Sequence, residues 1–132
     1  MMVILLIFFN MIIKGNRYQT RDITNSWMCF EFKKHQIIPS NYTIRSYNSA
    51  NHNHLKNWVF EGSTDNNNWI ILDQQENNSF LNGSSLVHSF QISNKNLDQQ
   101  SFKYLRIRQT GQNWINQNYL MMNSIEFYGK LI

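Results

Sequence analysis

Two short stretches of this chain hold side chains that could recognise a small polar ligand. The first runs from Arg45 past Asn48 and contains Asn51 and His52, and the second contains Trp114 inside a polar segment. An exposed tryptophan ring can cover the apolar face of a sugar, while amides, arginine and histidine pair with the sugar hydroxyls. These residue types therefore indicate carbohydrate binding as one chemistry open to the chain.

Catalysis and metal binding are less well supported. His52 and His54 lie two residues apart and could ligate a metal ion, but no Cys or cluster of carboxylates accompanies them. The sequence contains no Ser-His-acid spacing, no paired loop carboxylates and no phosphate-cradling glycine loop. We therefore predict that the protein is not an enzyme and uses neither a metal nor another cofactor.

Composition narrows the possible partners and compartment. The 132 residues suit one domain, 15% of them are charged, and the net charge is +4. The basic residues are scattered, with no run beyond Lys33-Lys34, so we expect no nucleic-acid partner and no membrane partner. Cys29 is the single cysteine. The absence of an intrachain disulfide favours the cytoplasm, with secretion as the alternative if Met1–Ile13 acts as a signal segment.

The chain is organised around Asn57–Asp73, which is expected to form a hairpin. Trp58, Phe60 and Gly62 alternate with Val59 and Glu61, which is the period of two that sends side chains to opposite faces of a sheet. The polar run 63–68 predicts a turn, and the apolar run 69–72 predicts the second strand. A tryptophan on each arm requires a second apolar layer to cover the hairpin.

Alternating segments continue along the rest of the chain. Further strands are predicted at Trp27–Phe32, Tyr42–Tyr47, Leu86–Ile92, Phe102–Thr110 and Tyr119–Leu131. The last is long enough to need a bulge near Asn123–Ser124. No segment shows a sustained helical period, so the sequence predicts an all-β sandwich. The expected core comprises Phe30, Ile44, Trp58, Trp69, Phe90, Leu105, Ile107 and Phe127.

Antiparallel strands place successive connections at alternate ends of such a sandwich. One end is therefore expected to hold residues 33–36, 63–68 and 93–101. The other is expected to hold residues 18–25, 48–56, 74–85 and 111–118, which include the candidate ligand-binding side chains. Arg106 and Arg108 share a strand face, and we expect them to pair with Glu61, Asp73 or Glu126 on neighbouring strands.

Several motifs, taken together, resemble a known family. The chain contains WVFEGSTD, YLRIRQTGQNW and SIEFYG in this order, with SWMCFEF ahead of them. Over Ser26–Ile132 this set resembles the discoidin-like domain, also called the coagulation factor V/VIII C-type domain. The versions in protist proteins and in BTB–kelch-like adaptors are the most similar. The resemblance implies a galactose-binding-like jelly-roll sandwich.

The resemblance also implies a function. Members of this family bind carbohydrates, phospholipid head groups or other proteins through loops at one end. The positions that fit the sugar-binding relatives are Arg45, Asn48, Asn51, His52 and Trp114. We expect a non-catalytic binding module that mediates protein interaction, with a lectin-like carbohydrate module as the alternative. The sequence does not indicate an oligomeric state.

The N-terminal segment departs from the family pattern. Residues 1–25 lack its usual first strands, so we divide the chain into an atypical segment at 1–25 and a sandwich domain at 26–132. Lys14–Asn25 is polar and is expected to form a loop. Met1–Ile13 is apolar, which leaves a buried strand or short helix, a signal or anchor, or a start foreign to the fold as alternatives. We predict that Val3–Phe9 packs on the sandwich in place of the missing strand.

Overall fold

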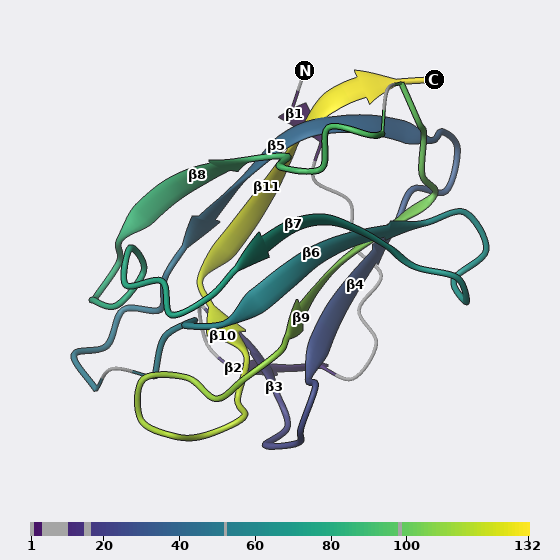
Figure 1. Ribbon diagram of the computed structural model, residues 1–132. Helices are drawn as coiled ribbons and strands as arrows, with labels where there is room; N and C mark the ends of the chain where they lie inside the picture. Colours follow the sequence, from purple (N-terminus) through teal and green to yellow (C-terminus); the bar gives the residue numbers. More distant parts are fainter. Residues whose placement is uncertain (1, 4–10, 15–16, 52, 98) are drawn as a thin grey trace.

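The computed structural model describes residues 2–3, 11–14, 17–51, 53–97 and 99–132, and in this part of the chain every regular element is a β-strand (Figure 1). No helix long and apolar enough to cross a membrane occurs among the described residues. The strands are β1 (Met2–Val3), β2 (Met11–Lys14), β3 (Arg17–Thr20), β4 (Trp27–Glu31), β5 (Ile37–Arg45), β6 (Trp58–Ser63), β7 (Ile70–Gln75), β8 (Val87–Gln91), β9 (Tyr104–Gln109), β10 (Met121–Met122) and β11 (Ser124–Leu131).

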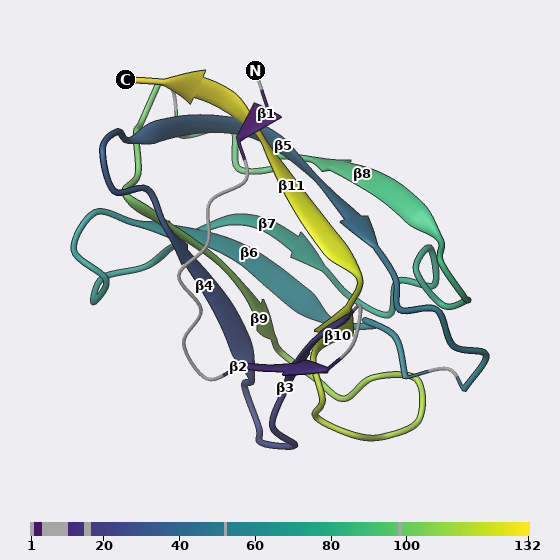
Figure 2. The same cartoon turned by 180° about the vertical axis from the view of Figure 1, so that it is seen from behind.

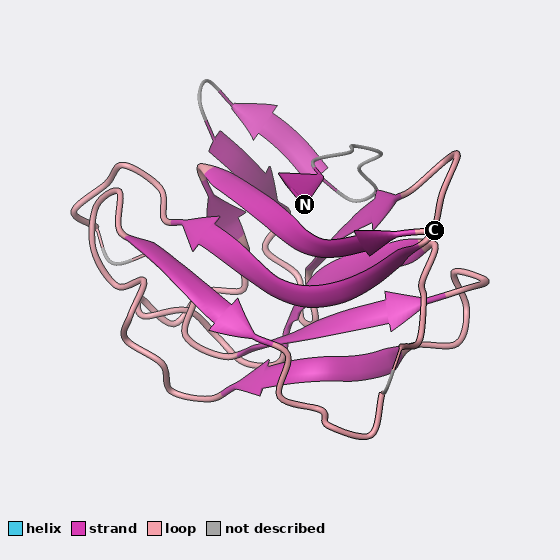
Figure 3. Cartoon of the chain, turned by 90° about the horizontal axis from the view of Figure 1, so that it is seen from above, coloured by secondary structure: helices cyan, strands magenta, loops and turns pink. Residues whose placement is uncertain are grey.

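Two four-stranded sheets pack face to face, as seen from above in Figure 3. One has the order β1-β11-β5-β8 and the other the order β4-β9-β6-β7, and every pairing in them is antiparallel. A small sheet with the order β10-β3-β2 lies beside them (Figure 2). The prediction of an all-β jelly-roll sandwich is confirmed, because the two large sheets bury one apolar face each against the other.

The core between the sheets is rich in aromatic rings. Trp58 and Phe60 of β6 stand opposite Tyr42, Phe90 and Phe127 of the other sheet, with ring centroids 4.4 to 5.7 Å apart. Such contacts are worth about 0.5–1.5 kcal/mol each beyond the area they bury. Seven of the eight predicted core residues are at most 4% exposed: Phe30, Ile44, Trp58, Phe90, Leu105, Ile107 and Phe127.

The prediction that Trp69 belongs to the core is wrong. It lies immediately before β7 rather than in the strand, and it is half-buried. The Arg106 guanidinium lies 3.9 Å from the centroid of its ring, so the tryptophan covers an arginine on the outer face of β9. The turn after β6 therefore folds over the outer face of the sheet and carries Trp69 away from the core.

The arginines of β9 confirm the expected ion pairing with Glu61. Arg106 Nη2 lies 2.7 Å from one Glu61 carboxylate oxygen, and Arg108 Nη2 lies 2.6 Å from the other. Glu61 is 2% exposed, and its strand β6 pairs directly with β9. The buried carboxylate of Glu61, on the outer face of the sheet, therefore partly neutralises the positive charges of both arginines.

The strand boundaries differ from the expectations in two places. The loop expected over Lys14–Asn25 contains β3, whose Tyr18 and Gln19 pair with β10. The pairing of β3 with β10 also joins the two parts, residues 1–25 and 26–132, into which we divided the chain from its sequence. The expected bulge near Asn123–Ser124 is a break between β10 and β11, since the chain changes there from pairing with β3 to pairing with β5.

The register shift in β11 occurs later, between Tyr128 and Gly129. It lies opposite Pro39, a residue that has no N–H to donate to a strand ladder. A Cβ atom on Gly129 would collide with the carbonyl oxygen of Ile38, so only glycine allows the two strands to approach this closely.

The N-terminal prediction is answered for two residues only. Met2 and Val3 pair antiparallel with Tyr128 and Phe127, which adds a short edge strand beside β11 (Figure 2). Val3 therefore extends the sheet as expected. The remainder of the predicted packing segment, residues 4–9, lies outside the described residues, so that part stays a prediction.

Candidate functional site

Hydrogen bonds join the connections predicted to share one end of the sandwich, which we call the loop end. Ser84 Oγ donates to Asn48 Oδ1 at 2.6 Å, and Asn118 N donates to Asp22 Oδ1 at 2.8 Å. Asn57 Nδ2 donates to the carbonyl of Gln112 at 3.4 Å. The four connections gather at the lower left of Figure 1. The predicted grouping of these loops is therefore confirmed, while their role in binding is not yet tested.

Trp114, the predicted aromatic platform, is half-buried in this end. The Lys56 ammonium lies 4.6 Å from the centroid of its ring, a cation–π contact that covers one face. Its backbone N–H points to the carbonyl of His54 at 3.4 Å. Its Nε1 is buried without a hydrogen-bond partner among the described residues. A sugar could stack on the covered face only if Lys56 moved away.

Arg45 and Asn48 lie at another corner of the loop end. Arg45 is the last residue of β5, is exposed, and pairs across the ladder with Val87 of β8. Asn48 is exposed and bonded to Ser84. No hydrogen bond or ring contact of the described residues links either of them to Trp114. The residues predicted as one site are therefore divided between two corners.

Of the remaining predicted residues, only Asn51 is among the described residues. Asn51 is exposed, and its backbone N–H donates to Ser49 Oγ at 3.2 Å. His52 lies outside the described residues. The neighbouring His54 is buried, with Nε2 2.9 Å from the carbonyl oxygen of Ser49, which indicates a structural role. No group of three His, Cys, Asp or Glu side chains able to hold a metal occurs in the described ranges.

The structure adds an aromatic residue that the sequence reasoning missed. Phe80 is 56% exposed, although it lies in a connection that we interpreted only as polar. Its ring stacks on His88 with centroids 4.4 Å apart and an interplanar angle of 19°. The imidazole stacks on one ring face, and more than half of the residue remains exposed to solvent. A lone phenylalanine within NNSFLNGSS was the signal that could have identified it.

His88 pairs across the ladder with Ile44, the residue before Arg45, and Ser84, in the same connection as Phe80, bonds to Asn48. The carbonyl of Leu86 accepts from Ser46 N at 2.8 Å, and this bond fixes the end of β5 beside the start of β8. Leu86 and Val87 are 40% and 51% exposed. We call this part of the loop end the β8 corner, defined by Arg45, Asn48, Phe80, Ser84, Leu86, Val87 and His88.

No reactive nucleophile accompanies these polar groups. Burial raises the pKa of the Cys29 thiol to about 11, so this side chain stays protonated at neutral pH. Its Sγ lies 4.0 Å from Asn66 Oδ1, on the outer face of β4 and far from the loop end.

No protein-family model matches the chain. Several solved structures of similar fold are carbohydrate-binding modules. The CBM32 module of AlyQ, solved with 4,5-unsaturated mannuronic acid, has a TM-score of 0.70 at 11% identity and covers 97% of this chain and 98% of its own. A Clostridium perfringens CBM32 module, solved with GalNAc-β-1,3-galactose, has a TM-score of 0.63 at 8% identity and covers 86% and 75%. A fucose-binding module of Streptococcus pneumoniae has a TM-score of 0.63 at 16% identity and covers 86% and 70%.

Curated proteins that match in sequence are far longer than this chain. The E3 ubiquitin-protein ligase Ufd4 of Drosophila melanogaster is 27% identical over 114 residues, which is 86% of this chain and 4% of the ligase. The E3 ubiquitin-protein ligase hecd-1 of Caenorhabditis elegans is 25% identical over 97 residues, which is 73% of this chain and 4% of the ligase. At these identities the solved structures show a shared β-sandwich fold, and the two ligases contain a segment of similar sequence.

Proposed function

We propose that the chain is a non-catalytic binding module whose loop end binds a carbohydrate. The observation that carries this proposal is the exposed Phe80 ring, stacked on His88 at the β8 corner. An aromatic ring with one face fixed and the other exposed is suited to stacking on a pyranose. The carbohydrate ligands named for the solved structures of this fold support the same ranking, ahead of the protein interaction expected from the sequence.

Polar groups around Phe80 suit the hydroxyls of a sugar. Arg45 supplies donors, and Asn48 and Ser84 form an exposed amide–hydroxyl pair. Asn51, His52 and Trp114, predicted from the sequence, remain proposed contacts. In this proposal Phe80 supplies the platform, and Trp114 supplies at most a flanking contact because Lys56 covers one of its faces.

The test is a glycan array probed with the wild-type protein and with Phe80→Ala. We expect saturable binding to a restricted set of glycans and a loss of about tenfold in the variant, the size of one aromatic contact plus its buried area. Ile71→Ala is the matched control, because Ile71 is also exposed and apolar but lies on β7. No glycan binding, or equal losses in both variants, would overturn the proposal.

Protein interaction is the second candidate. The curated ligases whose segments match this chain favour it, because a small domain within a very long protein commonly contacts other proteins. The exposed Leu86 and Val87 beside Phe80 could serve such a contact. Affinity capture with the wild type and with Leu86→Ser/Val87→Ser distinguishes the two. A stoichiometric protein lost in the double variant, without glycan binding, would support this candidate over the first.

A further inference from the structure

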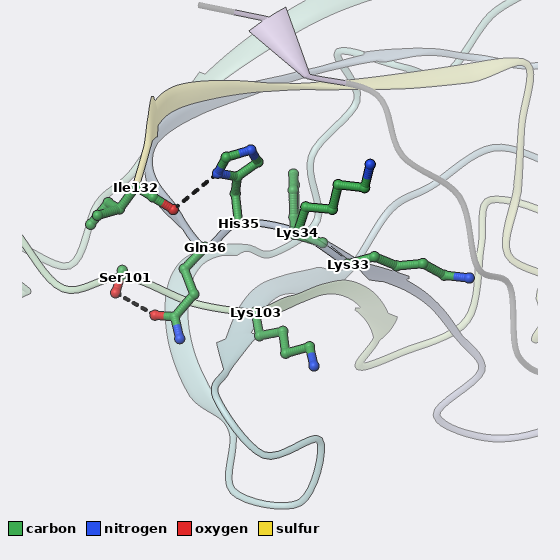
Figure 4. Close-up of a pocket in the computed structure, with 8 residues that line it drawn as sticks. Lys33, Lys34, His35, Gln36, Ser101, Lys103 and Ile132 are labelled. Atoms are coloured by element: carbon green, nitrogen blue, oxygen red, sulfur yellow. Dashed lines mark hydrogen bonds between the residues drawn. The ribbon is translucent and has the colours of Figure 1, made fainter.

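A second surface lies at the opposite end of the sandwich from the loop end. A hollow of about 370 Å³ is lined there by Lys33, Lys34, His35 and Lys103, together with Phe32, Gln36, Ser101 and Ile132. We call it the basic hollow. Figure 4 shows the three lysine side chains extending to the same side, while His35 turns to the carbonyl of Ile132 at 3.3 Å.

The lysines of the basic hollow are not neutralised by neighbouring residues. Among the described residues, ion pairs join only Arg106 and Arg108 to Glu61, on the outer face of β6 and β9. The side chains that line the hollow include no Asp or Glu. Lys103 Nζ lies 5.8 Å from the Tyr104 ring centroid, a weak contact that orients the ammonium and leaves its charge in place.

The fold does not require these charges. The backbone around the hollow is held by its own hydrogen bonds, such as Phe32 N to the Lys103 carbonyl at 2.8 Å and Lys103 N to the Ser63 carbonyl at 3.0 Å. Ser101 Oγ donates to Gln36 Oε1 at 2.6 Å and ties the two lining segments together. The three lysines therefore repel one another without stabilising the fold. Such a group of unpaired positive charges favours the binding of an anion.

We propose that the basic hollow binds an acidic segment of a partner protein, rich in Asp or Glu. Ammonium groups on flexible stems match several carboxylates without demanding a fixed planar geometry. Proteins that bind single-stranded nucleic acid stack its bases on aromatic rings, and the lining ring, Phe32, is 3% exposed. A membrane would require apolar side chains to insert, and the exposed apolar residue here is Ile132 alone among the described lining residues.

The experiment measures binding of a fluorescent Glu-rich peptide, with a Gln-rich peptide of equal length as the probe control. We expect the Glu-rich peptide to bind and the Gln-rich peptide to remain unbound. Lys33→Gln/Lys103→Gln removes two positive charges from the hollow and is expected to weaken binding about tenfold. Arg21→Glu changes the net charge by the same amount at the loop end, and is expected to alter binding less than about twofold.

Three results would overturn the proposal. The first is no binding of the Glu-rich peptide at low salt. The second is an equal loss in Lys33→Gln/Lys103→Gln and in Arg21→Glu, which would mean that net charge alone attracts the peptide. The third is tighter binding of vesicles containing phosphatidylserine, or of single-stranded RNA, that the double variant abolishes. The test does not depend on glycan binding, so its failure would leave the proposed function standing.

Discussion

The two sheets and the loop end satisfy their buried polar groups in different ways. In the sheets, Asp73 accepts from the Tyr42 hydroxyl at 2.6 Å and from Gln75 at 3.1 Å, and Glu61 accepts from two arginines. At the loop end, Asn53 Oδ1 and Trp114 Nε1 are buried without a partner among the described residues. His88 Nδ1 of β8 and Gln109 Oε1, at the last residue of β9, also lack a partner among these residues. The comparison teaches that the sheets pair their buried carboxylates internally, whereas the unpaired buried atoms are single amide, indole and imidazole atoms at the loop end and in β8 and β9.

The largest effect is expected from Glu61→Ala in the sheet. It would leave Arg106 and Arg108 side by side, each mostly buried, with no carboxylate between them. Removing one partner of a buried pair costs about 3–5 kcal/mol, and the partly exposed arginines place this case near the lower value. Urea unfolding measures the loss. The exposed Glu76→Ala serves as control, and similar stabilities of the two variants would contradict the account.

Tyr42→Phe tests the interior of the sandwich. The hydroxyl donates to Asp73 and accepts from Trp58 Nε1 at 3.0 Å, so its removal leaves two buried groups short of a partner. We expect a loss of about 1–3 kcal/mol in the free energy of unfolding. Phe90→Leu, which keeps this network, provides the comparison in a chemical denaturation series.

Alkaline pH tests the same hydroxyl without a mutation. Burial raises the pKa of Tyr42 far above its ordinary value, with the Asp73 charge acting in the same direction. Because the folded pKa is raised, the contribution to stability is complete below the unfolded value near 10 and falls as pH rises above it. Unfolding curves from about pH 8 to 11 should show this fall in the wild type and a smaller one in Tyr42→Phe.

A moderate effect is expected at Trp114. Its half-buried ring packs against Lys56, so Trp114→Ala should cost about 1–2 kcal/mol, less than a core tryptophan. Lys56→Gln removes the cation from the ring face and should cost less than about 1 kcal/mol. Thermal unfolding of both variants measures the difference. If Trp114→Ala lowered the free energy of unfolding as much as Glu61→Ala does, the expected difference in stability between the sheets and the loop end would be contradicted.

The smallest effect on stability is expected at Phe80. This residue is 56% exposed and its ring stacks on His88, so Phe80→Ala should change the free energy of unfolding by less than about 0.5 kcal/mol. Denaturant midpoints of the variant and the wild type provide the measurement. A larger loss would mean that the β8 corner supports the fold, and would weaken its assignment as a binding platform.

Sequence reasoning succeeded where a side chain's position follows from the period of its strand. Alternation placed Trp58, Phe90 and Phe127 in the core, and strand order placed the connections at the correct ends. It failed at Trp69 and Phe80, because the path of a connection decides what covers a ring. The alternation that buries Trp58 does not reveal that Trp69 turns onto Arg106, or that Phe80 rests on His88.

The central claim is that the exposed ring of Phe80, and not the half-buried ring of Trp114, receives the ligand. An NMR titration with GalNAc-β-1,3-galactose, the disaccharide named for one structure of this fold, follows both rings at once. The account predicts saturable shifts of the Phe80 ring signals, small shifts of the Trp114 indole N–H, and loss of the response in Phe80→Ala. Saturable shifts of Trp114 with a silent Phe80, or binding that survives in Phe80→Ala, would contradict it.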